Sequence, residues 1–244
     1  VALSTMNKTA IIIPSHLAAK RLPNKPLLKI RNKSMILHVW ERAKLSEVDD
    51  VFVATADQEI LEEIKSNGGQ AIMTRKDHTT GSDRIYEAIQ NLSLDHDIII
   101  NVQGDMPTIN PDTINILKNF MISNPNVSVA TVASKIEKEE IKDLNVVKAV
   151  TAQELKVDSF SQAKNFVRKI NNEEFFYHHI GLYSYKKEVL EKFIRLDRTA
   201  NEKERSLEQM RFLDNNIDIF VGYTKDSPLS VDTQEDLEKI RKMI

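Results

Sequence analysis

The chain has 244 residues, of which 41% are hydrophobic, and its 34 lysines and arginines nearly balance 36 aspartates and glutamates. The apolar fraction is enough for a folded core, while the formal charge of −2 argues against a duplex-binding surface. Because cysteine is absent, disulfides, zinc fingers, iron–sulfur sites and cysteine nucleophiles are excluded. No apolar run approaches the roughly 20 residues of a membrane span, and no signal peptide is recognisable. We therefore expect a cytoplasmic protein with no nucleic-acid or membrane partner.

The first half of the chain alternates short apolar, β-branched runs with amphipathic patterns. Strands are predicted at 9–13, 51–55, 71–73, 97–102 and 127–134. Helices are predicted at 34–45, 57–65, 82–91 and 111–122. The second of these helices opens at Asp57 as an N-cap, and the last follows Asn110-Pro111, a cap and a proline at the first helical position. Alternation of this kind predicts an α/β fold, with a mostly parallel sheet and helices on both faces.

The second half is less regular. Strands are predicted at 146–151, 174–185 and 217–223, and helices at 186–195, 202–214 and 233–243. The last helix opens with Thr233-Gln-Glu-Asp236, a capping-box pattern with Asp in the Glu position. We expect a single α/β domain over 7–244, with a smaller appended sheet in a subdomain at about 146–223. Residues 1–6 have no pattern, and we expect them to be disordered or an expression remnant.

Ligands of such sheets bind beyond the carboxyl ends of the strands, which directs attention to the loop 14–26, PSHLAAKRLPNKP. It places Lys20, Arg21 and Lys25 among three prolines, and proline stiffens a loop by fixing φ. Stiff cations after a first strand suit a polyphosphate, although a solvated basic loop fits the composition equally well. Neither G-x-G-x-x-G nor the P-loop pattern occurs, so a nucleotide site here needs another design.

Two aspartates are candidates for a metal site. The segment 97–107, DIIINVQGDMP, delivers Asp105 to the carboxyl edge of the sheet, where it is placed like a Mg²⁺ ligand or like an ordinary turn residue. Asp232 directly precedes the last predicted helix, and taken alone an N-cap role explains it better.

Two further segments give weaker signals. The turn in 76–87, KDHTTGSDRIYE, offers hydroxyl and backbone N–H groups to a base edge, but it is also an ordinary helix start. His178 and His179 are adjacent in a predicted strand, so they point to opposite faces and do not chelate one ion. Neither H-E-x-x-H nor G-x-S-x-G occurs in the sequence.

Taken together, the chemically informative segments occur in the order of one known family. They are the basic loop, VFVATAD, DHTTGSDR, IIINVQGDMP, LNVVKAV, HHIGLYSY, SLEQMRFL and SVDTQEDLEKI. In this order the chain resembles the 3-deoxy-manno-octulosonate (KDO) cytidylyltransferases from about Thr9 onward.

The resemblance implies a Rossmann-like nucleotide-diphospho-sugar transferase sheet and the reaction CTP + KDO → CMP-KDO + pyrophosphate, in lipopolysaccharide biosynthesis. It implies Mg²⁺ as cofactor and a homodimer as the assembly. CTP and a KDO-like sugar acid are the implied small-molecule partners. Phosphoryl transfer of this type needs positioning and charge neutralisation more than a covalent intermediate.

The resemblance also implies roles for individual residues. The implied catalytic residues are Lys25, Arg21 and Asp105. The implied metal ligands are Asp105 and Asp232. The implied nucleotide-binding residues are Pro14, His16, Arg21, Lys25, Thr79, Thr80, Gly81, Ser82 and Arg84. The implied sugar-binding residues are Gln103, His179, Tyr183, Glu208 and Gln209.

The chain departs from the family pattern at four positions. His16 replaces an Arg, Ala19 a Ser, Asn24 a Gly and Gln162 an Arg, which removes two permanent charges and a hydroxyl. These departures leave other interpretations open: a variant substrate such as the 8-amino analogue of KDO, a CMP-sialate-type synthetase, or a catalytically silent CTP-binding protein.

Overall fold

The structure is a computed structural model that describes residues 7–244. The expectation for residues 1–6 lies outside this range. The chain divides into two compact units, the first formed by the residues up to Asn115 together with Pro228–Ile244, the second by Ile116–Ser227. Helix α4 (Pro111–Ser123) begins in the first unit and ends in the second. None of the helices within 7–244 is long and apolar enough to cross a membrane.

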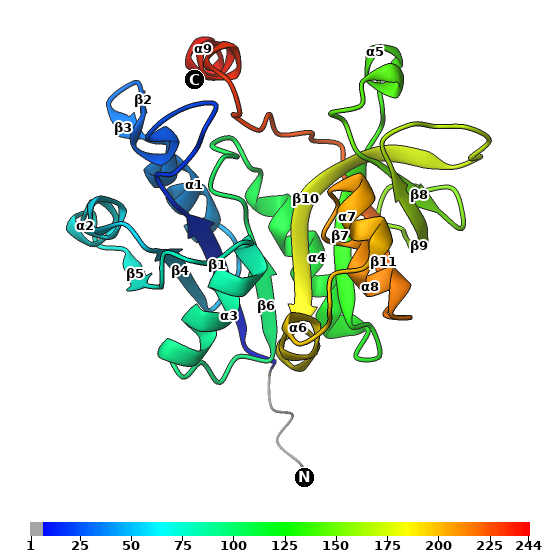
Figure 1. The fold of residues 1–244 in the computed structure, drawn as a ribbon, viewed down its shortest axis with the longest axis horizontal. Coiled ribbons are helices and arrows are strands. Elements are labelled where there is room, and N and C mark those ends of the chain that lie inside the picture. Colours follow the sequence, from blue (N-terminus) through cyan, green and yellow to red (C-terminus); the bar gives the residue numbers. More distant parts are fainter. Residues whose placement is uncertain (1–6) are drawn as a thin grey trace. The chain divides into compact units, whose positions relative to one another are not determined.

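The first unit contains a sheet with the strand order β5-β4-β1-β6, in which each neighbouring pair is parallel. These strands are β1 (Thr9–Ser15), β4 (Asp50–Thr55), β5 (Gln70–Met73) and β6 (Ile98–Asn101). Three helices join them in turn: α1 (Met35–Lys44), α2 (Gln58–Ser66) and α3 (Gly81–Asn91). Right-handed crossovers put α1 and α3 on opposite faces of β1, as Figure 1 shows.

A small apolar cluster holds the C-terminal helix α9 (Gln234–Met243) onto the basic loop of this unit. Between β1 and α1 the chain forms the 3₁₀ turn η1 (Lys25–Leu27) and a hairpin of β2 (Lys29–Ile30) and β3 (Lys33–Ser34). The members of the cluster come from this segment and from the chain end: Leu22, Ile30, Met35, Val231, Leu237 and Ile240. Apolar contacts thus join segments about two hundred residues apart in the sequence.

The second unit contains a mixed sheet with the strand order β10-β7-β11-β9-β8. Its strands are β7 (Val129–Ser134), β8 (Lys148–Thr151), β9 (Phe160–Val167), β10 (Phe176–Lys186) and β11 (Ile219–Tyr223). Among the pairs described within this second unit, only β7–β11 is parallel, and the long β10 pairs with both β7 and β8. The helices of this unit are α5 (Lys138–Lys142), α6 (Lys187–Ile194), α7 (Ala200–Arg205) and α8 (Met210–Asp214).

The predicted α/β class is confirmed, and so are most elements of the first half. The single helix predicted over 202–214 is wrong: α7 ends at Arg205, and the left-handed φ of 53° at the next residue, Ser206, separates it from α8. Strand β9 was not predicted because its inward positions carry small residues such as Ser161 and Ala163, which weaken the apolar alternation. The prediction of one domain with a subdomain at about 146–223 stays a prediction.

Leu237 is the member of the apolar cluster that tests how α9 is held, because its side chain is 1% exposed. Leu237→Ala leaves a cavity under the helix, so we expect a loss of about 2–5 kcal/mol of unfolding free energy. Chemical denaturation measures the loss. Met243→Ala, on the same helix at 66% exposure, is the matched control and should unfold like the unmodified protein. Equal stability of the two variants would contradict this account of the cluster.

Candidate active site

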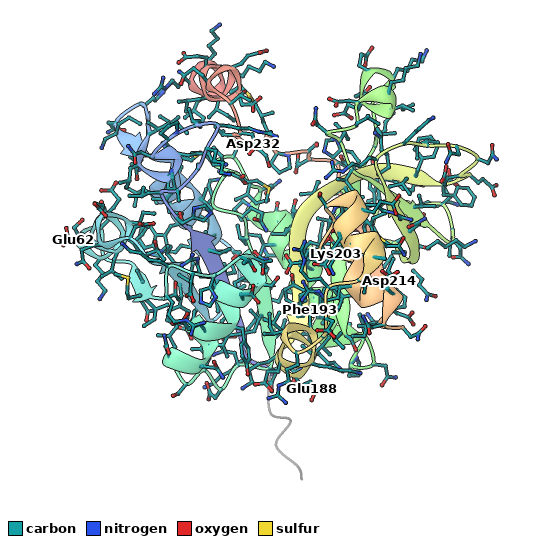
Figure 2. All side chains as sticks on the ribbon, viewed as in Figure 1. Glu62, Glu188, Phe193, Lys203, Asp214 and Asp232 are labelled. Atoms are coloured by element: carbon teal, nitrogen blue, oxygen red, sulfur yellow. The ribbon has the colours of Figure 1, made fainter. Side chains whose placement is uncertain are left out.

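A lysine of the first unit lies between two carboxylates that are far apart in the sequence. The Lys25 ammonium donates to Asp105 Oδ2 at 3.1 Å and to Asp232 Oδ1 at 3.2 Å. The side chains of Lys25 and Asp105 are 17% and 24% exposed, whereas that of Asp232 is 55% exposed. Figure 2 shows Asp232 on the segment that leads into α9. The two predicted metal ligands thus lie together around one cation.

The backbone on either side of the lysine fixes its position. Asn24 adopts the left-handed conformation, with φ 56° and ψ 24°, directly before η1, and asparagine is one of the few residues that tolerate it. The next residue after the lysine, Pro26, is buried and occupies the start of the 3₁₀ turn. The loop therefore presents Lys25 from a rigid turn.

The two aspartates are brought together by the main chain. Val231 N–H donates to the carbonyl of Asp105 at 2.9 Å, which ties the segment before α9 to the loop after β6. The predicted capping box is confirmed, with Thr233 as the N-cap and Asp236 as its partner. The N-cap interpretation of Asp232 is therefore wrong, since Thr233 does that work and the Asp232 carboxylate contacts Lys25 instead.

The charges of this cluster compensate one another only in part. Burial lowers the pKa of Lys25, but the two carboxylates outweigh burial and raise its pKa above the ordinary value. Burial raises the pKa of Asp105, and Lys25 opposes that rise. Among the described residues, Asp105 Oδ1 is buried with no hydrogen-bond partner. A buried carboxylate oxygen without a donor favours a further cation at this position.

One small cavity adjoins the cluster, and a second shares His16 with it. The first, of about 160 Å³, is lined by Pro14, Ser15, His16, Ala19, Lys25, Pro26, Gln103, Gly104 and Asp105. The other, of about 180 Å³, is lined by His16, Ala18, Ala56, Asp57, Lys76, His78 and Arg84. A Cβ on Gly104 would lie 3.2 Å from the Pro14 carbonyl, so glycine permits the close approach of these two loops. His16 belongs to both cavities, and burial, Arg84 and Lys25 lower its pKa against the opposing effect of Asp57.

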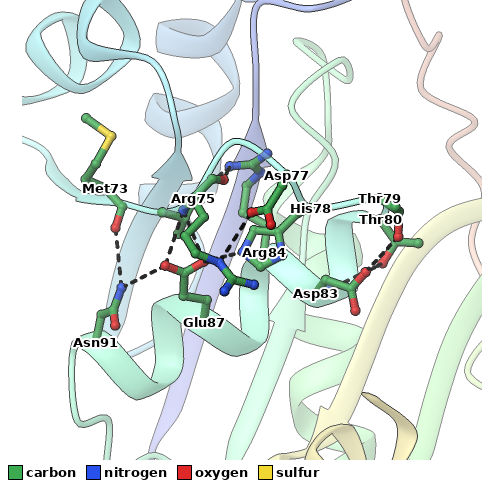
Figure 3. Close-up of polar contacts among 11 residues, drawn as sticks. Met73, Arg75, Asp77, His78, Thr79, Thr80, Asp83, Arg84, Glu87 and Asn91 are labelled. Carbon is green, nitrogen blue, oxygen red and sulfur yellow. Dashed lines mark hydrogen bonds and ion pairs between the residues drawn. The ribbon is translucent and has the colours of Figure 1, made fainter. Parts of the chain in front are cut away.

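The loop before α3 is held by its own polar contacts, which Figure 3 shows. Thr80 caps the helix by accepting from Asp83 N–H, and the Thr79 and Thr80 hydroxyls donate to the Asp83 carboxylate at 3.2 and 2.8 Å. Arg84 is buried and donates to Thr74 Oγ1 at 2.5 Å and to the Arg75 carbonyl at 3.1 Å. These residues therefore support the loop that lines the second cavity.

In the second unit, the predicted sugar-binding residues His179 and Tyr183 lie along β10. His179 is buried, its Nε2 lies 3.0 Å from Thr131 Oγ1, and burial lowers its pKa to about 3. Tyr183 Oη is buried with no hydrogen-bond partner among the described residues, and burial raises the pKa of Tyr183 well above its ordinary value. Both side chains are therefore neutral at physiological pH. Glu208 and Gln209 follow α7, and Gln209 is buried.

The ring of His179 is one member of an aromatic series in the second unit. It contacts Tyr183 edge-on at a centroid distance of 5.5 Å, and Tyr183 stacks on Tyr185 at 5.8 Å. The series continues through Phe212 to Phe193, a residue of α6 that Figure 2 labels. The neighbouring His178 makes a separate contact, with Glu140 Oε1 3.0 Å from its Nδ1. The two adjacent histidines thus have different partners, as their places in a strand predict.

Comparison with known proteins gives a consistent result. The cytidylyltransferase family model matches residues 10–219. The 3-deoxy-manno-octulosonate cytidylyltransferases of Brucella ovis and Nitrobacter hamburgensis are 43% and 41% identical to this chain, each over 98% of it and over 96% and 94% of their own lengths. A solved CMP:2-keto-3-deoxy-manno-octonic acid synthetase complexed with CTP is 35% identical, with a TM-score of 0.89 over 97% of this chain and 98% of that one.

The chain belongs to the 3-deoxy-manno-octulosonate cytidylyltransferase family. In this family member, four of the nine predicted nucleotide residues line the two cavities of the first unit: Pro14, His16, Lys25 and Arg84. Gly81 lies against Pro14. Arg21 is exposed and lines neither cavity, and its role stays a prediction. Gln103 lies in the first unit, whereas the other predicted sugar-binding residues lie in the second.

Two supporting contacts in this family member were not predicted from the sequence. Asp57 stands at the N-cap position of α2 but makes no side-chain cap; it accepts from Leu17 N–H at 2.8 Å and so anchors the basic loop. Its place directly after a strand was the available signal. Thr131 is fully buried in β7 beside His179, and nothing in its sequence context distinguishes it from a core residue.

Glu87 carries a pH-dependent part of the stability of the loop before α3. It accepts from Arg75 N–H at 3.1 Å and contacts His78, as Figure 3 shows. Burial raises its pKa, but these hydrogen bonds outweigh burial and lower the pKa below its ordinary value of 4.5. Its contribution is therefore complete above that value and is lost as the pH falls through the lower folded-state pKa.

We expect Glu87→Gln to cost about 1–2 kcal/mol of unfolding free energy at pH 7, and the difference from the unmodified protein to shrink below pH 4. Denaturation at a series of pH values measures it. Glu62→Gln, at an exposed site on α2 that Figure 2 labels, is the matched control and should show neither effect. A difference that stays constant with pH would contradict the assignment.

Proposed function

We propose that this protein activates KDO by transferring CMP from CTP, CTP + KDO → CMP-KDO + pyrophosphate, in lipopolysaccharide biosynthesis. The observation that carries the proposal is the Lys25 ammonium between Asp105 and Asp232 at the edge of the first cavity. Relatives above 40% identity over almost the whole chain support the same substrates. CTP as nucleotide is further supported by the 35% identical synthetase solved with CTP.

The carboxylate pair fits a magnesium ion by the chemistry of its donors. Mg²⁺ commonly takes one or two protein carboxylates and completes its six ligands with water and phosphate oxygens. The described residues hold no group of three or more His, Asp or Glu that suits a metal, so this pair would depend on substrate oxygens. When bound by Asp105 and Asp232, Mg²⁺ would supply positive charge to the triphosphate and favour ionisation of the sugar hydroxyl.

The chain's own residues position the reactants and neutralise charge. The anomeric hydroxyl of KDO attacks the α-phosphorus of CTP, the bond to the β-phosphate oxygen breaks, and the hydroxyl proton passes to solvent. Lys25 and Arg21 offset the charge of the triphosphate, while residues 79–82 and Arg84 line the cytidine site. For the sugar acid, the family resemblance assigns Gln103 in the first unit and, in the second unit, His179, Tyr183, Glu208 and Gln209. Such a transfer requires no covalent intermediate on the protein.

Several finer points belong to the same proposal. The parallel sheet of the first unit serves as a Rossmann-like platform for the nucleotide, and the mixed sheet of the second unit is the appended part. The enzyme works in the cytoplasm as a homodimer. The homodimer follows from the family resemblance.

Pyrophosphate release tests the reaction. We expect release from CTP with Mg²⁺ and KDO, and much less with UTP, ATP or sialic acid; the 8-amino analogue of KDO tests the departure at Gln162. Asp105→Asn keeps the shape of the side chain but removes its charge, so we expect kcat to fall at least about 100-fold with the fold intact. CTP-dependent thermal stabilisation without release from any sugar acid would show a silent binding protein instead. Near-normal turnover of Asp105→Asn would show that the metal site is misplaced.

Lys25 occupies the two oxygens that a metal would use, so cation and ammonium compete for them. Without nucleotide, Lys25→Met should therefore bind Mn²⁺ about tenfold more tightly than the unmodified protein, as measured by electron paramagnetic resonance. Lys20→Met, an exposed lysine of the same loop, is the matched control and should leave Mn²⁺ affinity unchanged. Equal affinity of the two variants would refute the competition.

A further inference from the structure

Thr131 contacts three groups at a distortion of the second unit's sheet. The register of β10 on β7 shifts between Ile180 and Tyr183, opposite this threonine. The Thr131 hydroxyl lies 2.7 Å from the Leu182 carbonyl, 3.3 Å from the Ile180 carbonyl and 3.0 Å from His179 Nε2. Thr131 is fully buried, so these contacts replace water.

The proton positions of this group follow from donor counting. A hydroxyl has one proton, and carbonyl oxygens only accept, so the short contact with Leu182 places the Thr131 proton on that bond. Only a lone pair of the hydroxyl then faces His179 Nε2, and Nε2 must donate. Because burial keeps the imidazole neutral, Nε2–H carries its only ring proton and Nδ1 keeps a lone pair.

The ring is also held in place by its neighbours. Phe166 packs against it at a centroid distance of 4.9 Å and Tyr183 at 5.5 Å, both edge-on. The imidazole therefore has a fixed orientation as well as a fixed proton.

We propose that Thr131 is a positioning residue that locks His179 in the Nε2–H tautomer, so that Nδ1 accepts a hydrogen bond from a hydroxyl of the sugar acid. The inference rests on the proposed function for the identity of the ligand, but the tautomer itself does not depend on it. A neutral acceptor repels a carboxylate and attracts an O–H donor. His179 therefore recognises a hydroxyl of KDO and not its carboxylate.

Nitrogen NMR of the full chain with ¹⁵N-labelled histidine tests the tautomer without any substrate, the His179→Asn variant identifying the signal. We expect a bare Nδ1 and a protonated Nε2 in the unmodified protein and in Thr131→Ser, which keeps the hydroxyl. Thr131→Val is nearly isosteric but removes the acceptor for Nε2–H, so we expect a mixture of tautomers. A protonated Nδ1 in the unmodified protein, or an unchanged spectrum in Thr131→Val, would overturn the proposal.

Kinetics test the consequence for the ligand. Thr131→Val should raise KM for KDO about fivefold to tenfold and leave KM for CTP unchanged, while Thr131→Ser behaves like the unmodified protein. Equal changes in both KM values, or no change for KDO, would refute the recognition of the hydroxyl. If the unmodified protein used no sugar acid, the proposed function would fail, and the spectrum would still decide the tautomer.

Discussion

The candidate site of the first unit is built around one interaction, the shared contact of Lys25 with Asp105 and Asp232. A partly exposed ion pair of this kind contributes only about 0–1 kcal/mol to stability, so it does not hold the fold together. The apolar cluster around Leu237 and the backbone bond from Val231 to Asp105 do that work. These contacts bring two carboxylates close together, which is unfavourable unless a cation lies between them. The packing thus creates an electrostatic requirement, and Lys25 satisfies it in the absence of a ligand.

The departures from the family pattern differ in what they change: one affects only the backbone conformation of the loop, and others affect the charge of the cavity. Asn24 is accommodated, because the position needs a left-handed backbone and asparagine tolerates one almost as well as glycine does. His16 and Ala19 both line the cavity beside Lys25 and bring no permanent charge to it. Since the surroundings of His16 lower its pKa further, the positive charge that lines this cavity comes from Lys25. The loop therefore keeps its shape while its charge is reduced.

What the sequence predicted and what it did not can be explained residue by residue. The ends of the strands could be predicted because continuous aliphatic runs such as 98–100 indicate buried parallel strands. Asp105 follows such a run. The approach of Asp232 to Asp105 was implied only by resemblance, because a contact across more than a hundred residues leaves no local pattern. The break at Ser206 was missed since the flanking residues are good helix formers, and the left-handed turn that ends α7 has no glycine to mark it. Asp57 was predicted to cap its helix and instead accepts from a loop N–H, and Thr131 was not singled out, because both partners come from tertiary structure.

The two units solve the problem of polar burial in opposite ways. In the first, charges are placed side by side and balanced, so a ligand that carries charge changes the balance and any cation competes with Lys25. In the second, burial keeps the side chains of His179 and Tyr183 on β10 neutral. Such groups distinguish ligands only by which atoms donate and which accept hydrogen bonds. A charged site responds to the number of charges on a ligand, which suits a triphosphate with its metal. A neutral site with fixed protons responds to which atoms donate and which accept, which suits a polyhydroxylated acid whose relatives differ in the placement of hydroxyl and amino groups. Under the proposed function, selection of the nucleotide's phosphates by Lys25 and selection of the sugar by His179 and Tyr183 would therefore rest on separate physical terms.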